Sequence, residues 1–139
     1  MIAVLLSLAC ARPEPLTYAI PAGFDGWVDV ELSVSGVAVA PLVAGERVVA
    51  IGAEGSARTG SGLGSGGIRC VASEGSPLPV LEDQGVGYDE AWTVTRPSPF
   101  VCCRTNRSER RAGEAERTFE RFYVGRGPAL TAARAPPFP

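Results

Sequence analysis

The stretch Trp27-Val28-Asp29-Val30-Glu31-Leu32-Ser33-Val34 alternates apolar and polar side chains. In an extended chain, Val28 and every second residue after it fall on one face, and the acidic and hydroxyl side chains fall on the other. This alternation is typical of a β-strand with one buried face. Residues 21–26, Pro-Ala-Gly-Phe-Asp-Gly, come directly before it. Proline fixes φ and the glycines tolerate positive φ, so we predict a turn that leads into a strand over residues 27–34.

Short apolar runs recur along the chain at intervals of roughly ten residues, with Gly, Ser or Pro between them. The predicted strands are Arg47–Ile51, Ile68–Ala72, Leu78–Leu81, Ala91–Thr95, Phe100–Cys103 and Phe119–Val124. The 139 residues, 45% of them hydrophobic, suffice for one core and one domain. We therefore predict an all-β fold, either a small antiparallel β-sandwich or a partly open barrel with long loops.

Residues 106–120 are rich in Glu, Arg and Ala and break this pattern. Arg110 and Glu114 are four residues apart, a spacing that supports a helix, while Gly113 weakens a helix by about 1 kcal/mol relative to Ala. Two interpretations remain open: one short solvated helix, or a charged loop between two strands. We favour the loop.

The N-terminal residues 1–9 form an uncharged apolar run that ends in a small residue. A membrane-spanning helix needs about 20 residues, so the run is too short to span. It has instead the pattern of a signal-peptide core with a cleavage site. The segment 6–10, Leu-Ser-Leu-Ala-Cys, resembles the lipobox of bacterial lipoproteins, in which the cysteine becomes the first mature residue and carries acyl chains. The alternative is a hydrophobic first strand with a buried Cys10.

The proline-rich segment after Cys10 behaves as a tether, which favours the lipoprotein interpretation. We expect a signal peptide over 1–9, the lipidated cysteine and tether over 10–17, a β-domain over 18–126 and a disordered proline-rich tail over 127–139. The resemblance implies export and attachment through the lipid to a bacterial membrane, facing the periplasm or the cell exterior. A lipid with several acyl chains anchors stably.

Two missing residue types restrict the chemistry of the chain. Without His it lacks the commonest general base and metal ligand. Its thirteen basic residues are all Arg, so Schiff-base chemistry on Lys is excluded. The net charge of −2 is spread along the chain and forms no basic stripe, so we expect no nucleic-acid partner. We predict that the domain is not an enzyme and that it has no cofactor.

Four acidic residues, Glu82, Asp83, Asp89 and Glu90, cluster around two glycines. Paired carboxylates can act as the acid and nucleophile of a hydrolase, or can offer oxygen ligands to Ca²⁺. Their spacing matches no Ca²⁺ loop, and acidic residues in turns are usually only solvated. A hydrolase that uses residues 82–90 is nevertheless our alternative to a non-catalytic domain.

Three cysteines, Cys70, Cys102 and Cys103, remain if Cys10 is lipidated. Export would place them in an oxidising compartment. Adjacent cysteines bridge each other only through a strained peptide, so we expect any disulfide to join Cys70 to Cys102 or Cys103. A thiol nucleophile would want a His partner, so we favour structural roles.

Residues 60–67 contain a formal G-x-G-x-x-G pattern at Gly62, Gly64 and Gly67. A dinucleotide site needs a helix after this motif, whereas a strand is predicted here, so we favour a flexible Gly/Ser loop. Aromatic residues could build a platform for a glycan, but they are also the usual filling of a β core. The candidates are Trp27, Tyr88, Trp92, Phe100 and Tyr123, and we expect all but Tyr88 in the core.

The chain also resembles an uncharacterised family of bacterial lipoprotein-associated β-domains. The family opens on a Pro-x-Gly-aromatic-x-Gly-x-Val pattern, matched by residues 21–28, and ends on Phe-Tyr-Val-Gly, matched by residues 122–125. Its central Gly and Thr are matched by Gly55 and Thr59. The resemblance spans residues 18–126 and implies a β-rich exported domain without an assigned activity. We expect a structural or binding module of the cell envelope with an unknown protein or glycan partner.

Overall fold

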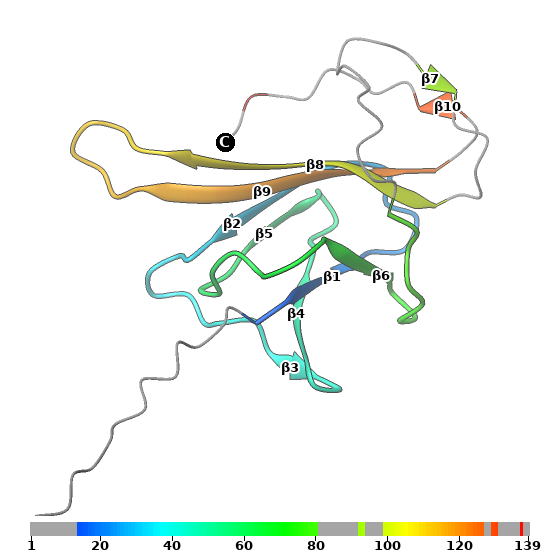
Figure 1. Cartoon of the computed structure of the whole chain (residues 1–139), viewed down its shortest axis with the longest axis horizontal. Helices are drawn as coiled ribbons and strands as arrows, with labels where there is room; N and C mark the ends of the chain where they lie inside the picture. Colours follow the sequence, from blue (N-terminus) through cyan, green and yellow to red (C-terminus); the bar gives the residue numbers. More distant parts are fainter. Residues whose placement is uncertain (1–13, 81–91, 94–98, 127–128, 131–136, 138–139) are drawn as a thin grey trace, which may run out of the picture.

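The computed structural model describes residues 14–80, 92–93, 99–126, 129–130 and 137, and these form an all-β fold (Figure 1). No helix occurs among the described residues. The strands are β1 (Leu16–Ile20), β2 (Gly26–Leu32), β3 (Leu42–Val43), β4 (Glu46–Ala50), β5 (Ser56–Arg58), β6 (Arg69–Ala72), β7 (Trp92–Thr93), β8 (Phe100–Glu109), β9 (Arg117–Gly125) and β10 (Ala129–Leu130). The predicted all-β class is confirmed.

Two four-stranded sheets make up the domain. The first sheet has the order β3-β4-β1-β6, and the second has the order β5-β2-β9-β8. Figure 1 shows them as two layers, with the second sheet uppermost. Because the sheets share no strand, the described strands do not form a closed barrel. β7 and β10 pair separately as a small antiparallel ribbon.

Both sheets are mixed, so the pairing differs from that of the antiparallel sandwich that was one of our two predicted architectures. β1 runs parallel to β4 and to β6, and β2 runs parallel to β5. The cause is that the chain crosses repeatedly between the layers: β1, β3, β4 and β6 lie in one sheet, and β2, β5, β8 and β9 lie in the other. A strand that returns to its sheet after such an excursion can run in the same direction as its neighbour. Only β3–β4 and β8–β9 pair as consecutive antiparallel neighbours within the two sheets.

One of the two inner strands of the first sheet is β1, which begins at Leu16. This start lies two residues before residue 18, where we expect the β-domain to begin. Leu16, Tyr18 and Ile20 alternate in the period of a strand, and all three are buried.

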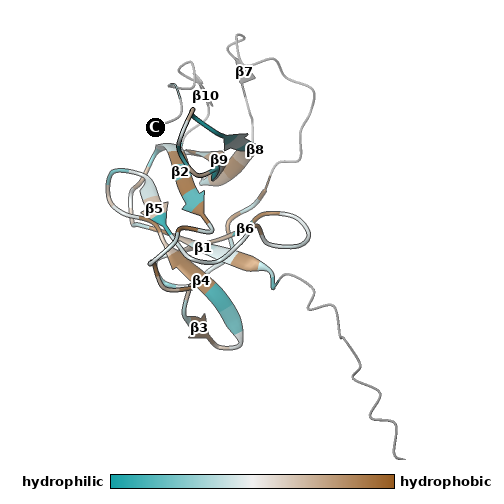
Figure 2. Ribbon diagram, turned by 90° about the vertical axis from the view of Figure 1, so that its left-hand side faces the viewer, coloured by the Kyte–Doolittle hydropathy of each residue, from teal (hydrophilic) through white to brown (hydrophobic). Residues whose placement is uncertain are grey.

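The core lies between the sheets and is built from the buried faces of both. It consists of Leu16, Tyr18, Ile20, Val28, Val30, Leu32, Ala40, Val49, Ile51, Cys70, Leu78, Val101, Phe122 and Val124. At its centre the rings of Tyr18 and Phe122 lie 5.2 Å apart. Full burial of one large apolar side chain contributes about 1.5–3 kcal/mol to the free energy of unfolding. The packing of the two sheets against each other is therefore the main source of stability. Figure 2 shows the hydrophobic colouring on the strands that enclose this core.

The charged segment is neither a helix nor simply a loop. Residues up to Glu109 continue β8, which pairs with β9 from Arg117 onward, so only residues 110–116 connect the two strands. The predicted strand at 78–81 is reduced to an isolated bridge between Val80 and Val101. Of the tail for which we predicted disorder, Ala129–Leu130 form β10 and Pro137 is also described.

The surroundings of Gly55 leave no room for a side chain. Its φ is +85°, and a Cβ atom would lie 2.6 Å from the Trp27 carbonyl oxygen. Gly36 also has a positive φ, +77°, but a Cβ atom there meets nothing within 4 Å. Gly36→Ala should therefore cost only the backbone strain, about 1–2 kcal/mol. Gly55→Ala should cost about 1–3 kcal/mol more, because packed backbone must also move.

Urea unfolding of the two variants measures this difference as a separation of their midpoints. Equal midpoints would mean that Gly55 does not sit against Trp27 as described.

Candidate functional site

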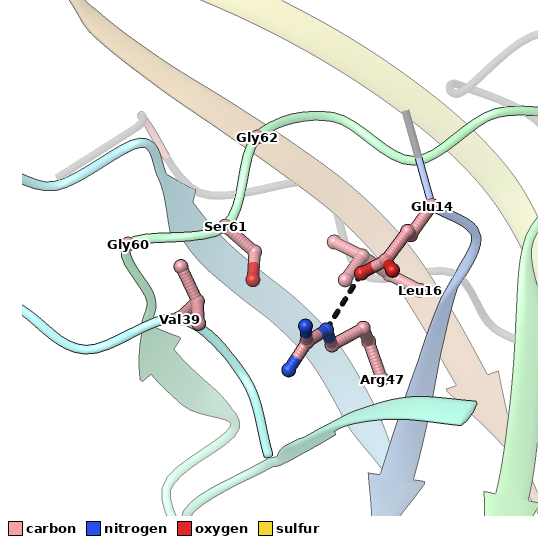
Figure 3. Close-up of a pocket in the computed structure, with 7 residues that line it drawn as sticks. All are labelled: Glu14, Leu16, Val39, Arg47, Gly60, Ser61 and Gly62. Carbon is pink, nitrogen blue, oxygen red and sulfur yellow. Dashed lines mark hydrogen bonds and ion pairs between the residues drawn. The ribbon is translucent and has the colours of Figure 1, made fainter. Parts of the chain in front are cut away.

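A hollow of about 220 Å³ opens where the chain enters β1 (Figure 3). Its walls come from four separate parts of the chain: the start of β1, the loop before β3, β4, and the loop after β5. The residues that line it are Glu14, Leu16, Val39, Arg47, Gly60, Ser61 and Gly62. Leu16 and Val39 give it apolar walls, and Glu14 and Arg47 supply its charged groups. This combination of apolar wall and few polar groups is typical of a binding site.

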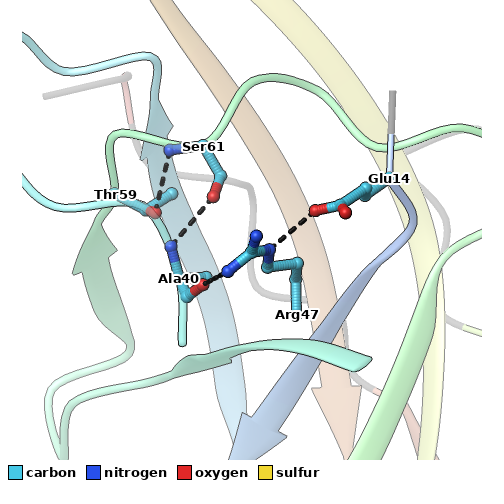
Figure 4. A network of polar contacts seen from close by, with 5 residues as sticks. All are labelled: Glu14, Ala40, Arg47, Thr59 and Ser61. Carbon is cyan, nitrogen blue, oxygen red and sulfur yellow. Dashed lines mark hydrogen bonds and ion pairs between the residues drawn. The ribbon is translucent and has the colours of Figure 1, made fainter. Parts of the chain in front are cut away.

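The polar groups of the hollow bond to one another (Figure 4). The Arg47 Nε donates to the Glu14 carboxylate over 2.6 Å, and its Nη1 donates to the Ala40 carbonyl over 3.1 Å. The Ala40 N–H donates in turn to the Ser61 hydroxyl oxygen over 2.9 Å. Glu14, the one carboxylate that lines the hollow, therefore accepts a hydrogen bond from a guanidinium and not from a hydroxyl group. The base–nucleophile pair of covalent catalysis is not formed among these residues. The arrangement favours binding.

Our sequence reasoning missed this hollow. Glu14 had been assigned to the tether and Arg47 to a strand, and the two are 33 residues apart in the sequence. Neither belongs to a local motif, so only the pairing of β1 with β4 brings them together.

The Gly/Ser loop that carries Gly62, Gly64 and Gly67 leads into β6, not into a helix. The helix N-terminus that a dinucleotide phosphate needs is therefore missing from this loop. The loop lies close against the sheets: a Cβ atom on Gly64 would lie 2.8 Å from the Leu16 nitrogen, and the Gly66 carbonyl accepts a hydrogen bond from Arg104.

A buried polar cluster lies beneath this loop. The Glu120 side chain, 2% exposed, pairs with Arg104 over 3.1 Å. The Tyr18 hydroxyl is buried beside it without a hydrogen bond from the described residues. A cavity of about 10 Å³, lined by Tyr18, Arg104 and Glu120, has the volume of about one water molecule. Burial, then the negative charge of Glu120, raises the pKa of Tyr18 above its usual range. This cluster holds the loop in place.

The outer face of the second sheet carries a row of ion pairs. Asp29 and Arg121 face each other across β2 and β9 with contacts of 2.5 and 2.9 Å. Glu31 accepts hydrogen bonds from Arg117 at 2.9 and 3.1 Å and from Arg58 at 3.2 Å. The bonds from Arg117 lower the pKa of Glu31 and outweigh the opposing effect of its desolvation. These cross-strand pairs fix the register of the sheet.

Aromatic side chains continue the same face. The Trp27 and Tyr123 rings meet edge to face, 5.1 Å apart. Phe100 and Tyr123 are buried, 1% and 9% exposed, as predicted for core residues and not for an open glycan platform. Trp27 is half-buried. Tyr88 and the side chain of Trp92 lie outside the described residues.

The disulfide differs from our expectation. Cys102 is bonded to its neighbour Cys103, and Cys70 is a buried free cysteine. Cys103 has a φ of +64° and lies in a β-bulge between Cys102 and Thr105, where two residues of β8 face one residue of β9. This irregular backbone lets adjacent cysteines meet, which a regular strand would prevent by pointing them to opposite faces.

Other predicted site residues lie outside the described part of the chain. These are Cys10 and the acidic residues Glu82, Asp83, Asp89 and Glu90. Within the described ranges, no group of three or more His, Cys, Asp or Glu side chains is placed to hold a metal ion. Those ranges also contain no helix long and apolar enough to cross a membrane.

Comparison with known proteins gives one structural likeness. The chain is similar to the crystal structure of a putative lipoprotein from Bacillus anthracis, with a TM-score of 0.49 and 19% sequence identity, over 88% of this chain and 80% of that chain. No family model and no curated protein matches the chain. The family resemblance drawn from short motifs therefore stays a prediction.

The Asp29–Arg121 pair should contribute far more to stability than the exposed pair beside it. Asp29→Ala removes the carboxylate from a guanidinium that is only 3% exposed, and the expected loss is about 3–5 kcal/mol. Arg58→Ala removes a 64% exposed partner from Glu31, and should cost no more than about 1 kcal/mol. Thermal and urea unfolding of both variants test this ranking, and equal losses would contradict it.

Alkylation distinguishes the two disulfide arrangements. Burial, together with the nearby Glu120 carboxylate, raises the pKa of Cys70 to about 12, so its thiol should not react in the folded protein. After unfolding without reductant, a maleimide added below neutral pH, where disulfide exchange is slow, should label only Cys70 among Cys70, Cys102 and Cys103. Peptide mass spectrometry locates the label. A label on Cys102 or Cys103 with Cys70 protected would restore the arrangement that we first expected.

Proposed function

We propose that the chain is an exported, non-catalytic lipoprotein domain, anchored to a bacterial membrane by acyl chains on Cys10. The observation that carries this proposal is the lipobox-like segment 6–10, which follows an apolar leader and directly precedes a proline-rich stretch. β1 begins at Leu16, so only five residues separate Cys10 from this inner strand of the first sheet. This is the organisation of a folded domain placed close behind a lipid anchor.

The side chains of the described residues support a non-catalytic role. The carboxylates of Asp29, Glu31 and Glu120 are each bonded to arginine. Hydrolases of the paired-carboxylate type need two carboxyl groups that face each other, at least one with a raised pKa. These three carboxylates instead hold strands and loops together.

A binding role rests on the hollow at the start of β1. It offers two aliphatic side chains, Leu16 and Val39, and one carboxylate–guanidinium pair at the surface. A protein or glycan partner that supplies both apolar surface and hydrogen-bonding groups would complement it. The domain would then act at the cell envelope by holding such a partner close to the membrane.

Mass spectrometry of protein extracted from membranes tests the anchor. We expect the mature chain to begin at Cys10, with a mass increase that corresponds to acyl chains, and to partition into detergent. Cys10→Ala should abolish both the modification and the detergent partitioning, because no other residue takes the lipid. Cys70→Ala is the matched control and should leave them unchanged. A soluble protein that begins at Met1 with an unmodified Cys10 would refute the anchor.

A further inference from the structure

The large hydrophobic side chains that reach the surface are concentrated at one end of the domain. Five such residues are exposed among those described, and four of them lie on β3 or on the two loops that help to line the hollow at the start of β1. These four are Val39 (56% exposed), Leu42 (57%), Val43 (55%) and Leu63 (38%), and we call them the apolar rim. The fifth, Val80, bridges to β8 in the second sheet.

The sheet register places Leu42 of the apolar rim level with the start of β1. Leu42 of β3 is level with Arg47 of β4, which is level in turn with Leu16 of β1. Val39 lines the hollow, and Leu63 adjoins Gly64, which packs against the Leu16 backbone. Figures 1 and 2 both place β3 and the start of β1 at the end of the domain away from β8 and β9. In Figure 2 the hydrophobic colour of β3 marks this end.

The chain length between the anchor and the domain limits where this end can lie. Four peptide units join Cys10 to Glu14, and they span at most about 14 Å. If Cys10 is held at the bilayer surface by its acyl chains, Glu14 is held within that distance of the surface, and Val39 of the apolar rim lines the same hollow as Glu14. A tether this short makes even a weak contact with lipid effectively intramolecular.

We propose that the apolar rim is a membrane-docking surface that rests on the lipid bilayer beside the anchor. The proposal depends on the lipid at Cys10 proposed above. Exposed aliphatic side chains on a two-residue edge strand invite association with other chains, and contact with lipid would cover them. The nearby charges are paired, Glu14 with Arg47 and Glu46 with Arg69, so docking depends on apolar contact and not on anionic lipid.

The test uses full-length lipidated protein in phosphatidylcholine vesicles, with an environment-sensitive fluorophore on a new cysteine. Val43→Cys places the label on the apolar rim, and Ser108→Cys places it on the exposed far end of β8. The other thiols do not compete, since Cys10 is acylated, Cys70 is buried and Cys102 is bonded to Cys103. Vesicles with brominated acyl chains then quench only a label that reaches the hydrocarbon.

At position 43 we expect a several-fold rise in fluorescence on reconstitution and strong quenching by the brominated lipid, because a docked apolar surface enters the headgroup–acyl boundary. At position 108 we expect neither. Leu42→Glu in the position-43 protein should abolish the quenching while the lipid on Cys10 is retained. Val80→Glu, a charge at an exposed valine outside the apolar rim, should leave the quenching unchanged.

Each contrary result has a separate meaning. If mass spectrometry finds the acyl chains but both labels stay in water, docking is refuted and the anchor stands. If Cys10 carries no lipid, the proposed function fails and docking fails with it. If the label at 43 becomes shielded without vesicles as protein concentration rises, the apolar rim binds a second copy of the chain, which also overturns docking.

Discussion

The contact between Tyr18 and Phe122 joins an inner strand of each sheet, and the rest of the structure depends on it. β1 lies between β4 and β6, and β9 lies between β2 and β8, so these two rings lock the two layers face to face. Because Tyr18 carries a hydroxyl, this contact also brings a polar atom to the edge of the core. The Glu120–Arg104 pair and the Gly/Ser loop enclose that atom, so core packing and loop position are coupled.

The outer face of the second sheet and the region around the start of β1 expose different kinds of side chain. On the second sheet, charged and aromatic side chains lie against one another. Arg121 forms an ion pair with Asp29 and lies near the Trp27 ring, and the Arg117 guanidinium lies over the Phe119 ring. At the start of β1, aliphatic side chains remain exposed around a single carboxylate–guanidinium pair. Internal pairing leaves the outer face with few groups to offer a partner. The opposite end instead combines a hollow with exposed aliphatic side chains.

The amino-acid sequence predicts β2 and several other strands from alternation or short apolar runs, but it misses β1, and it misses what depends on pairing between distant strands. β2 was predicted because its valines and leucine alternate with acidic residues, and β4, β6 and β9 were predicted from similar apolar runs. Alternation states which face is buried but not which strand lies alongside, so the parallel pairing of β1 with β4 could not be foreseen. The Cys102–Cys103 disulfide depends on a bulge, and Glu14–Arg47 on two distant strands, and neither leaves a local pattern in the sequence.

The start of β1 at Leu16 changes how an anchor would act on the domain. A tether that reached residue 17 would let the domain turn freely and would leave its orientation to chance. Glu14 bonds to Arg47 of β4, so the chain already contacts the sheet four residues after Cys10. Only a short segment of chain therefore separates a lipid on Cys10 from the first sheet. If the apolar rim docks on the bilayer as proposed, the hollow lies toward the membrane and the ion-paired face of the second sheet away from it. A partner that binds in the hollow would then have to be one that is itself found at the membrane surface.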